Sequence, residues 1–216
     1  MNQIRTYFTA HQDQILGWAQ TTGWLATLPV AIGLTLALPC GWLAYRHPAV
    51  RTLVTSGLGV LYTIPSLVMF LVIPEILGTK ILSPLNVVSA LTLYTFTLLV
   101  RSVLDGLDSV PAPMLSTATA MGHTTGQRLL SVQLPLALPV IGAGLRVAAV
   151  SNVSLISVAS VIGTAQLGQL FLAGNNTGSL PPIVLGLISF TAIALLFDLA
   201  IVAALRLLTP WRAVTR

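Results

Sequence analysis

The chain has 216 residues, of which 55% are hydrophobic and only 7% are charged, and its formal net charge is +5 at pH 7. Soluble domains carry about 25% charged residues, so this composition excludes an ordinary soluble protein and predicts one that lies in a membrane. In such a protein the positive charge concerns topology, and we expect no nucleic-acid partner. The single cysteine, Cys40, excludes an internal disulfide and provides no metal site.

The first predicted membrane span covers residues 24–45, which carry no charge. Trp24 and Trp42 are eighteen residues apart in it, which corresponds to about 27 Å along an α-helix. That length matches the separation of the two aromatic belts at the surfaces of a bilayer. Residues 1–23 are polar to amphipathic, and we expect them to lie at the interface or to begin the first helix early.

Four further apolar stretches predict four more spans, at 52–77, 85–104, 136–162 and 183–208. Residues 163–182, between the last two spans, are rich in Gly, Gln, Asn and Ser and predict a polar loop. We therefore predict an all-α membrane protein with about five transmembrane helices, folded as a single transmembrane domain over residues 1–216. An odd number of spans places the two termini on opposite sides of the membrane.

Apart from charges close to the ends of the spans, two charges fall inside predicted spans, Arg146 and Asp198. Charges within a membrane are costly and often functional. The structural alternative, which we favour, is that both lie near one interface, where they snorkel or pair with each other. In either case they would fix how their two helices are oriented.

A polar, helix-forming stretch at about 109–135 separates the third span from the fourth. Ser109 or Pro111 can open a short helix there, because proline is tolerated in a first helical turn. Gly122 can take the left-handed conformation that ends this helix.

The second half of the stretch predicts another short helix. Thr124 or Thr125 can cap it, and it would run to Leu134 before Pro135 restarts the chain toward the membrane. Two short helices at an angle would form a compact knob outside the bilayer.

The spacing within this stretch resembles the cytoplasmic coupling loop of binding-protein-dependent ABC importer permeases. The family pattern is Glu-Ala-Ala, three residues, Gly, nine residues, Ile, any residue and Leu-Pro. Here the Gly, an aliphatic residue and the Leu-Pro fall in register, whereas a serine stands at the Glu position and a threonine at the first Ala. The resemblance implies a contact with an ATPase made by Ser116, Thr117, Ala118, Gly122, Leu134 and Pro135.

Two other stretches resemble the osmoprotectant permeases of this family. Residues 62–66 read Tyr-Thr-Ile-Pro-Ser, and residues 162–168 resemble a glycine-rich stretch that lies near the translocation path in the family. The resemblance implies a pathway role for Thr63, Pro65, Ser66, Gly163 and Gly168. A glycine-rich extracellular turn is the structural alternative for the second stretch.

The resemblance covers about residues 24–212 and is nearest to the glycine betaine, carnitine and choline branch. It implies the fold of a type I ABC importer permease and import of a quaternary ammonium compatible solute. An importer for methionine or another amino acid is an alternative of the same class. A secondary carrier or channel without an ATPase would usually show inverted repeats, and an intramembrane enzyme would need paired catalytic residues; neither feature is evident.

The resemblance also implies the partners. The sequence has no phosphate-binding loop of the Gly-x-x-x-x-Gly-Lys-Ser/Thr type, so we expect no catalysis and no cofactor in this chain, with ATP and Mg²⁺ bound by separate ATPase subunits. An extracellular substrate-binding protein and a second permease subunit complete the expected complex. Ser116 keeps some capping ability but lacks the charge of glutamate, which favours a heterodimer with a standard permease over a homodimer.

The cations choose an orientation in the bacterial cytoplasmic membrane. With the coupling loop inside, most of them fall inside or at the inner boundary: Arg46, Arg51, Arg101, Arg128, Arg206, Arg212 and Arg216. Only Arg5 and Lys80 fall outside. The positive-inside rule therefore predicts an external N-terminus and a cytoplasmic C-terminus.

Overall fold

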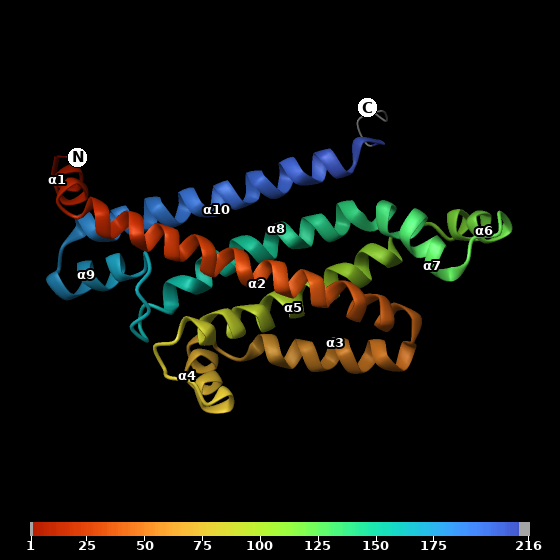
Figure 1. The fold of residues 1–216 in the computed structure, drawn as a ribbon, viewed down its shortest axis with the longest axis horizontal. Coiled ribbons are helices and arrows are strands. Elements are labelled where there is room, and N and C mark those ends of the chain that lie inside the picture. The colour runs from red at the N-terminus through yellow and green to blue at the C-terminus, as the bar shows by residue number, and fades with distance from the viewer. Residues whose placement is uncertain (1, 212–216) are drawn as a thin grey trace.

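The computed structural model describes residues 2–211, and these are almost entirely helical (Figure 1). The elements in chain order are α1 (Asn2–Ala10), α2 (Gln12–Arg46), α3 (Pro48–Thr63), α4 (Ser66–Leu77), α5 (Pro84–Asp108), α6 (Ala112–Ala120), α7 (Thr125–Arg128), the π-helical turn η1 (Leu129–Gln133), α8 (Leu134–Val158), α9 (Gln169–Thr177) and α10 (Leu180–Leu208). Within the described residues, four helices are long and apolar enough to cross a membrane, and α3 and α4 are apolar enough only when taken together, as a bent pair.

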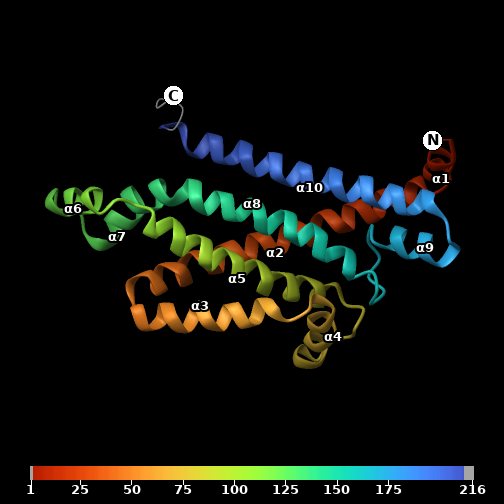
Figure 2. The same ribbon diagram turned by 180° about the vertical axis from the view of Figure 1, so that it is seen from behind.

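The long helices run side by side, with α5 at their centre between α2 and α8 (Figures 1 and 2). In the span window of α5, 61% of the residues are buried, against 6% in that of α10. Small residues allow close approach: a Cβ added at Gly41 of α2 would lie 2.6 Å from Cγ1 of Val103 in α5. This is how transmembrane helices commonly pack, because lipid offers no hydrophobic driving force of its own.

The first span confirms the early start, since α2 begins at Gln12, well before Trp24. The expectation of a continuous second span is wrong. Helices α3 and α4 meet at 105°. Pro65 between them has no N–H to continue the helical ladder, and it pushes Ile64 into an extended conformation with ψ 128°.

The expectation of a purely polar loop at 163–182 is also wrong, because it contains the helix α9. Apolar residues hold this helix on the bundle: Leu170 is fully buried, and the ring of Phe171 stacks on that of Phe190 in α10 at 5.6 Å between centroids. Gly178 ends α9 in the left-handed conformation, with φ 61°.

The predicted stop at Leu134 is a third correction. Residues 125–158 run as one helical path in which η1 connects α7 to α8. Pro135 is the second residue of α8, and the wider π-helical turn before it accommodates the missing N–H without breaking the path.

The basic residues separate between the two ends of the bundle. Arg46 ends α2, Arg128 ends α7 and Arg206 lies in the last turn of α10, all at the end that carries α6 (Figure 1). Arg5 lies in α1, and Lys80 lies between α4 and α5, at the opposite end. Of the other arginines counted from the sequence, Arg51 lies in the first turn of α3 and Arg101 in the second half of α5, whereas Arg212 and Arg216 lie outside the described residues.

Candidate functional site

The first half of the 109–135 loop folds as predicted. Pro111 is the N-cap of α6, and Gly122 follows the helix with φ 86°. The backbone N–H of His123 donates to the carbonyl of Ala118 at 3.1 Å and closes the turn. A Cβ at Gly122 would meet no other atom within 4 Å, so only its backbone conformation favours glycine here.

The second half begins with a capping box at Thr124, not Thr125. The N–H of Thr124 donates to Oε1 of Gln127 at 2.9 Å, and the N–H of Gln127 donates back to Oγ1 of Thr124 at 3.4 Å. Nη1 of Arg128 donates to Oγ1 of Thr119 at 3.0 Å and ties α7 to α6. The two helices therefore form one knob, as the sequence predicts.

The expected capping role of Ser116 is wrong. Ser116 is the fifth residue of α6, beyond the first turn, and its hydroxyl donates back to the carbonyl of Pro113 at 2.9 Å. The hydroxyl of Thr117 donates to the same carbonyl at 2.8 Å. Both side chains are exposed, so both are accessible to a partner that binds the loop.

The other residues of the predicted contact are less accessible. Ala118 is buried, and Leu134 and Pro135 are half-buried at the start of α8. The sequence pattern thus combines two kinds of residue: an exposed group on α6 and around Gly122, and a supporting group beneath it.

Two shallow hollows lie on the surface of this knob. One, of about 350 Å³, is lined mainly by apolar groups, from Pro113, Met114, Thr117, Ala118, Met121 and Val132. The other, of about 300 Å³, is polar and is lined by Met121, Gly122, His123, Gln127 and Ser131. The sequence interpretation missed the two exposed methionines, although apolar, flexible side chains in a polar loop are a recognisable signal of a contact surface.

Gln133 is a further residue that the interpretation missed. It ends η1, is buried, and donates from Nε2 to the hydroxyl of Tyr45 in α2 at 3.3 Å. This bond joins the base of the loop to the neighbouring span. The available signal was an amide in an otherwise apolar run, because a buried amide needs a partner.

The first group of predicted pathway residues lies at the break between α3 and α4. Thr63 ends α3, Pro65 stands in the break, and Ser66 begins α4. The hydroxyl of Tyr94 in α5 donates to the carbonyl of Ile64, which the break has freed from the helical ladder. The break is therefore a fixed feature of the fold.

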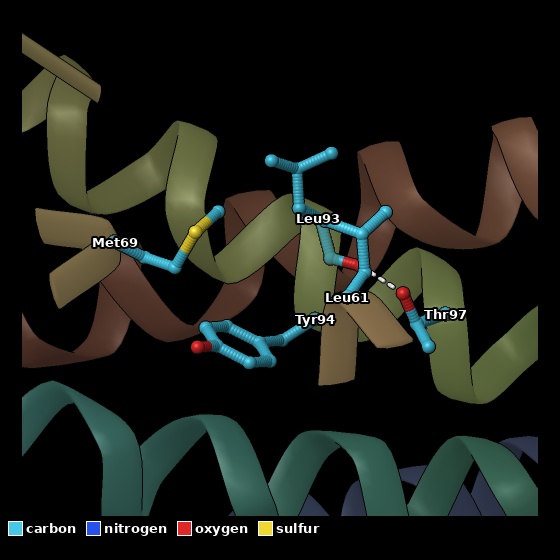
Figure 3. Close-up of a pocket in the computed structure, with 5 residues that line it drawn as sticks. All are labelled: Leu61, Met69, Leu93, Tyr94 and Thr97. Carbon is cyan, nitrogen blue, oxygen red and sulfur yellow. Dashed lines mark hydrogen bonds between the residues drawn. The ribbon is translucent and has the colours of Figure 1, made fainter. Parts of the chain in front are cut away.

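Side chains fill the space beside this break (Figure 3). Leu61 of α3, Met69 of α4 and three residues of α5, namely Leu93, Tyr94 and Thr97, line a small, partly open pocket. The hydroxyl of Thr97 donates to the carbonyl of Leu93 at 2.8 Å, so it is satisfied within its own helix. The lining is mainly apolar and supports the bend from inside.

The second group of predicted pathway residues frames the segment that leads into α9. Gly163 has φ 87°, and a Cβ at Gly168 would lie 2.7 Å from the carbonyl oxygen of Ser157. The buried Gln166 between them donates to the carbonyl of Ile156 at 3.1 Å and accepts from the N–H of Gly168 at 2.6 Å. These contacts account for the two glycines by backbone conformation and close packing.

The two charges predicted within spans do pair. Nε and Nη2 of Arg146 in α8 lie 2.6 and 2.9 Å from the two carboxylate oxygens of Asp198 in α10. A second bidentate pair, which the interpretation missed, joins Arg51 in α3 to Asp108 at the end of α5, at 3.2 and 2.5 Å. In residues 2–211 no group of three or more His, Cys, Asp or Glu residues could hold a metal ion.

Comparison with known proteins gives a consistent result. A family model described as "Binding-protein-dependent transport system inner membrane component" matches residues 15–214. The "Osmoprotectant import permease protein OsmW" of Salmonella typhimurium is 34% identical over 190 residues, which cover 87% of this chain and 88% of that protein. The "Carnitine transport permease protein OpuCB" of Listeria monocytogenes is 30% identical, with 97% of this chain and 95% of that protein covered.

Solved structures share the fold. A chain of the inward-facing MetNI methionine ABC transporter superposes with a TM-score of 0.81 and 19% identity, covering 93% of this chain and 98% of that one. A chain of an amino acid ABC transporter solved with histidines has a TM-score of 0.74 and 21% identity, covering 93% and 97%. The predicted fold of a type I ABC importer permease is thereby confirmed.

Proposed function

Because this chain belongs to the family of binding-protein-dependent transport system inner membrane components, we propose that it is the permease through which a quaternary ammonium compatible solute is imported. The observation that carries the proposal is the nearly full-length similarity to relatives named for osmoprotectant and carnitine transport, which covers 87% and 97% of this chain. Glycine betaine, choline and carnitine are the candidate solutes. A separate extracellular binding protein delivers them.

The knob formed by α6 and α7 is the surface that contacts the ATPase. The support is its shape: two short helices tied by the bond from Arg128 to Thr119, with Met114 and Met121 exposed beside a shallow apolar hollow. ATP and Mg²⁺ are held by that partner, where hydrolysis takes place. This chain contributes the path and the contact that couples it to hydrolysis.

The knob lies in the cytoplasm, with the N-terminus outside and the C-terminus inside. The support is the gathering of arginines at the ends of α2, α7 and α10, beside α6. Single cysteines at Ser131 and Thr177 in a Cys40→Ser background test this. We expect an impermeant thiol reagent to label Thr177→Cys in intact cells and not Ser131→Cys, and the reverse pattern would invert the orientation.

The complex contains a second, different permease. The support is the exposed Ser116 at the position where the family has glutamate, in a loop whose residues 109–135 include no carboxylate. A partner permease with the usual Glu would give one ATPase a standard contact. Purification through a tag on this chain, after co-expression with the neighbouring transporter genes, should recover both permeases. An active complex with this chain as its only membrane subunit would exclude the requirement.

Reconstitution tests the function itself. The purified complex in proteoliposomes, with its binding protein and ATP, should import radiolabelled glycine betaine, choline or carnitine, whereas methionine should not accumulate. Omission of ATP should abolish accumulation. Uptake that persists without ATP would indicate a carrier, and preferential uptake of methionine would replace the proposed substrate class.

A further inference from the structure

The helix α3 carries two chemically different faces, and this difference decides which side of the helix is turned toward the rest of the protein. None of its residues is fully buried. Val50, Val54 and Leu58 pack against the core. A second face presents small polar residues at helical spacing and is exposed along its whole length: Thr52, Thr55, Ser56, Gly59 and Thr63.

Most of the hydroxyls on this face are bonded to carbonyls of the same helix. The hydroxyls of Thr52 and Thr55 donate to carbonyls four residues earlier in the helix, and that of Thr63 donates to the carbonyl of Val60. Three of the four hydroxyls on this face are therefore bonded within the helix. This face leads toward the break between α3 and α4, but by itself it does not discriminate between solutes.

The aromatic ring of Tyr62 lies at the C-terminal end of this face. Tyr62 is 44% exposed, although it lies in the last turn of a membrane helix. Its ring packs against that of Tyr94 at 5.8 Å between centroids and 80° between planes. Tyr94 is in turn fixed by its hydrogen bond to the carbonyl of Ile64. The exposed ring is thus held in place by a buried one.

The backbone carbonyls at the C-terminal end of α3 point toward the same break between α3 and α4. The carbonyl of Leu61 accepts from the N–H of Ile64 at 3.3 Å, and that of Ile64 accepts from Tyr94. Within residues 2–211, no backbone N–H donates to the carbonyls of Tyr62 and Thr63, because Pro65 interrupts the ladder. These oxygens and the negative end of the helix dipole give the break a negative potential.

We propose that the ring of Tyr62 and the free carbonyl end of α3 form a transit site for the quaternary ammonium group of the solute, an inference that rests on the proposed function. A quaternary ammonium has no N–H, so it cannot be recognised by hydrogen-bond acceptors in the usual way. Aromatic faces and partial negative charge attract it instead. A broken membrane helix that exposes carbonyls is also the arrangement in which transporters hold cations.

Substitution of Tyr62 tests the site in the complete transporter. In proteoliposomes that contain the whole complex and its binding protein, glycine betaine is the probe. Tyr62→Phe keeps the ring, and we expect its kcat/KM for uptake to stay within about twofold of the unmodified transporter. Tyr62→Leu removes the ring, and the loss should be about 5- to 30-fold. The control is Leu53→Ala, which alters another exposed side chain of α3.

Two further readouts separate recognition from stability. Replacement of Tyr62 by phenylalanines of increasing fluorination weakens the ring's negative face at nearly constant shape, so uptake should fall progressively with each fluorine. In the Tyr62→Leu transporter, the loaded binding protein should still stimulate the ATPase, so that more ATP is hydrolysed per solute imported.

The outcomes are distinguishable. If the unmodified transporter imports no quaternary ammonium compound, the proposed function fails. If it does, the transit site is refuted by Tyr62→Leu behaving as Leu53→Ala, by Tyr62→Phe losing as much as Tyr62→Leu, or by uptake that does not respond to fluorination. Should Tyr62→Leu fail to assemble, the fluorinated series alone decides.

Discussion

Replacement of Asn152 by leucine should destabilise the bundle through one buried hydrogen bond. Nδ2 of Asn152 in α8 donates to Oγ1 of Thr95 in α5 at 2.7 Å, and both residues are buried. The side chain of Thr95 also touches α2, since a Cβ added at Gly33 would lie 2.7 Å from Cγ2 of Thr95. Three spans therefore meet at one polar contact.

The magnitude follows from the two ends of this bond. Hydrogen bonds between membrane helices contribute about 0.6 kcal/mol on average and up to about 1.7. Leaving a buried partner unsatisfied costs about 1–3 kcal/mol. Thr95→Val leaves the amide of Asn152 without a hydrogen-bond partner, and we expect it to lower the free energy of unfolding by about 1–3 kcal/mol. Asn152→Leu leaves only the hydroxyl of Thr95 without its donor, and we expect a smaller loss. The double variant should lose less than the sum of the two.

Thermal unfolding of the purified chain in detergent measures the effect. A loss of 1 kcal/mol corresponds to about 2–4 °C in Tm for a chain of this length, on the scale of soluble proteins. Asn176→Leu is the control, because Asn176 is exposed in α9 and should leave Tm unchanged. Strict additivity of the two single variants would refute a direct bond between these side chains.

Two other substitutions test the loop and the ion pair. Gly122→Val should reduce import coupled to ATP hydrolysis without changing solute capture by the binding protein, because φ 86° strains a β-branched residue; Gly126→Val, at a glycine without positive φ or near neighbours, is the control, and equal damage by both would remove the conformational argument. Asp198→Leu should lower the yield of folded protein by leaving Arg146 without its carboxylate, and exchange of the two charges should restore it; a double exchange no better than the single variant would mean that the pairing contributes nothing.

Much of the fold could be predicted because composition and local spacing decide it. Apolar length alone located the spans, and the left-handed turn at Gly122 depends on neighbours only a few residues away. The break at Pro65 was missed because mean hydropathy does not report whether a helix is straight or bent. Residues 52–77 are apolar on average in either case. The dipeptide Ile64-Pro65 was the available signal.

Polar pairs between spans could not be predicted in the same way. Gln133 and Tyr45 are 88 residues apart, and Asn152 and Thr95 are 57 apart. Each amide in an apolar run signals that a partner exists, but only the packing of the helices decides which partner. Pairing of Arg146 with Asp198 was one of the arrangements expected from the sequence, because no other charge lies as far from the ends of these two spans.

These contacts also determine which parts of the chain move together. Helix α7 passes through η1 into α8 without a break, so a displacement of the knob must carry α8 with it. Bonds from Gln133 and Asn152 connect that path to α2 and α5, and the pair of Arg146 connects it to α10. By contrast, α3 is held at its far end chiefly through Tyr94 and has no buried residue. A displacement of the knob would thus move α8 together with α2, α5 and α10, while α3 stays attached to α5 at both ends, through Arg51 and Asp108 and through Tyr94.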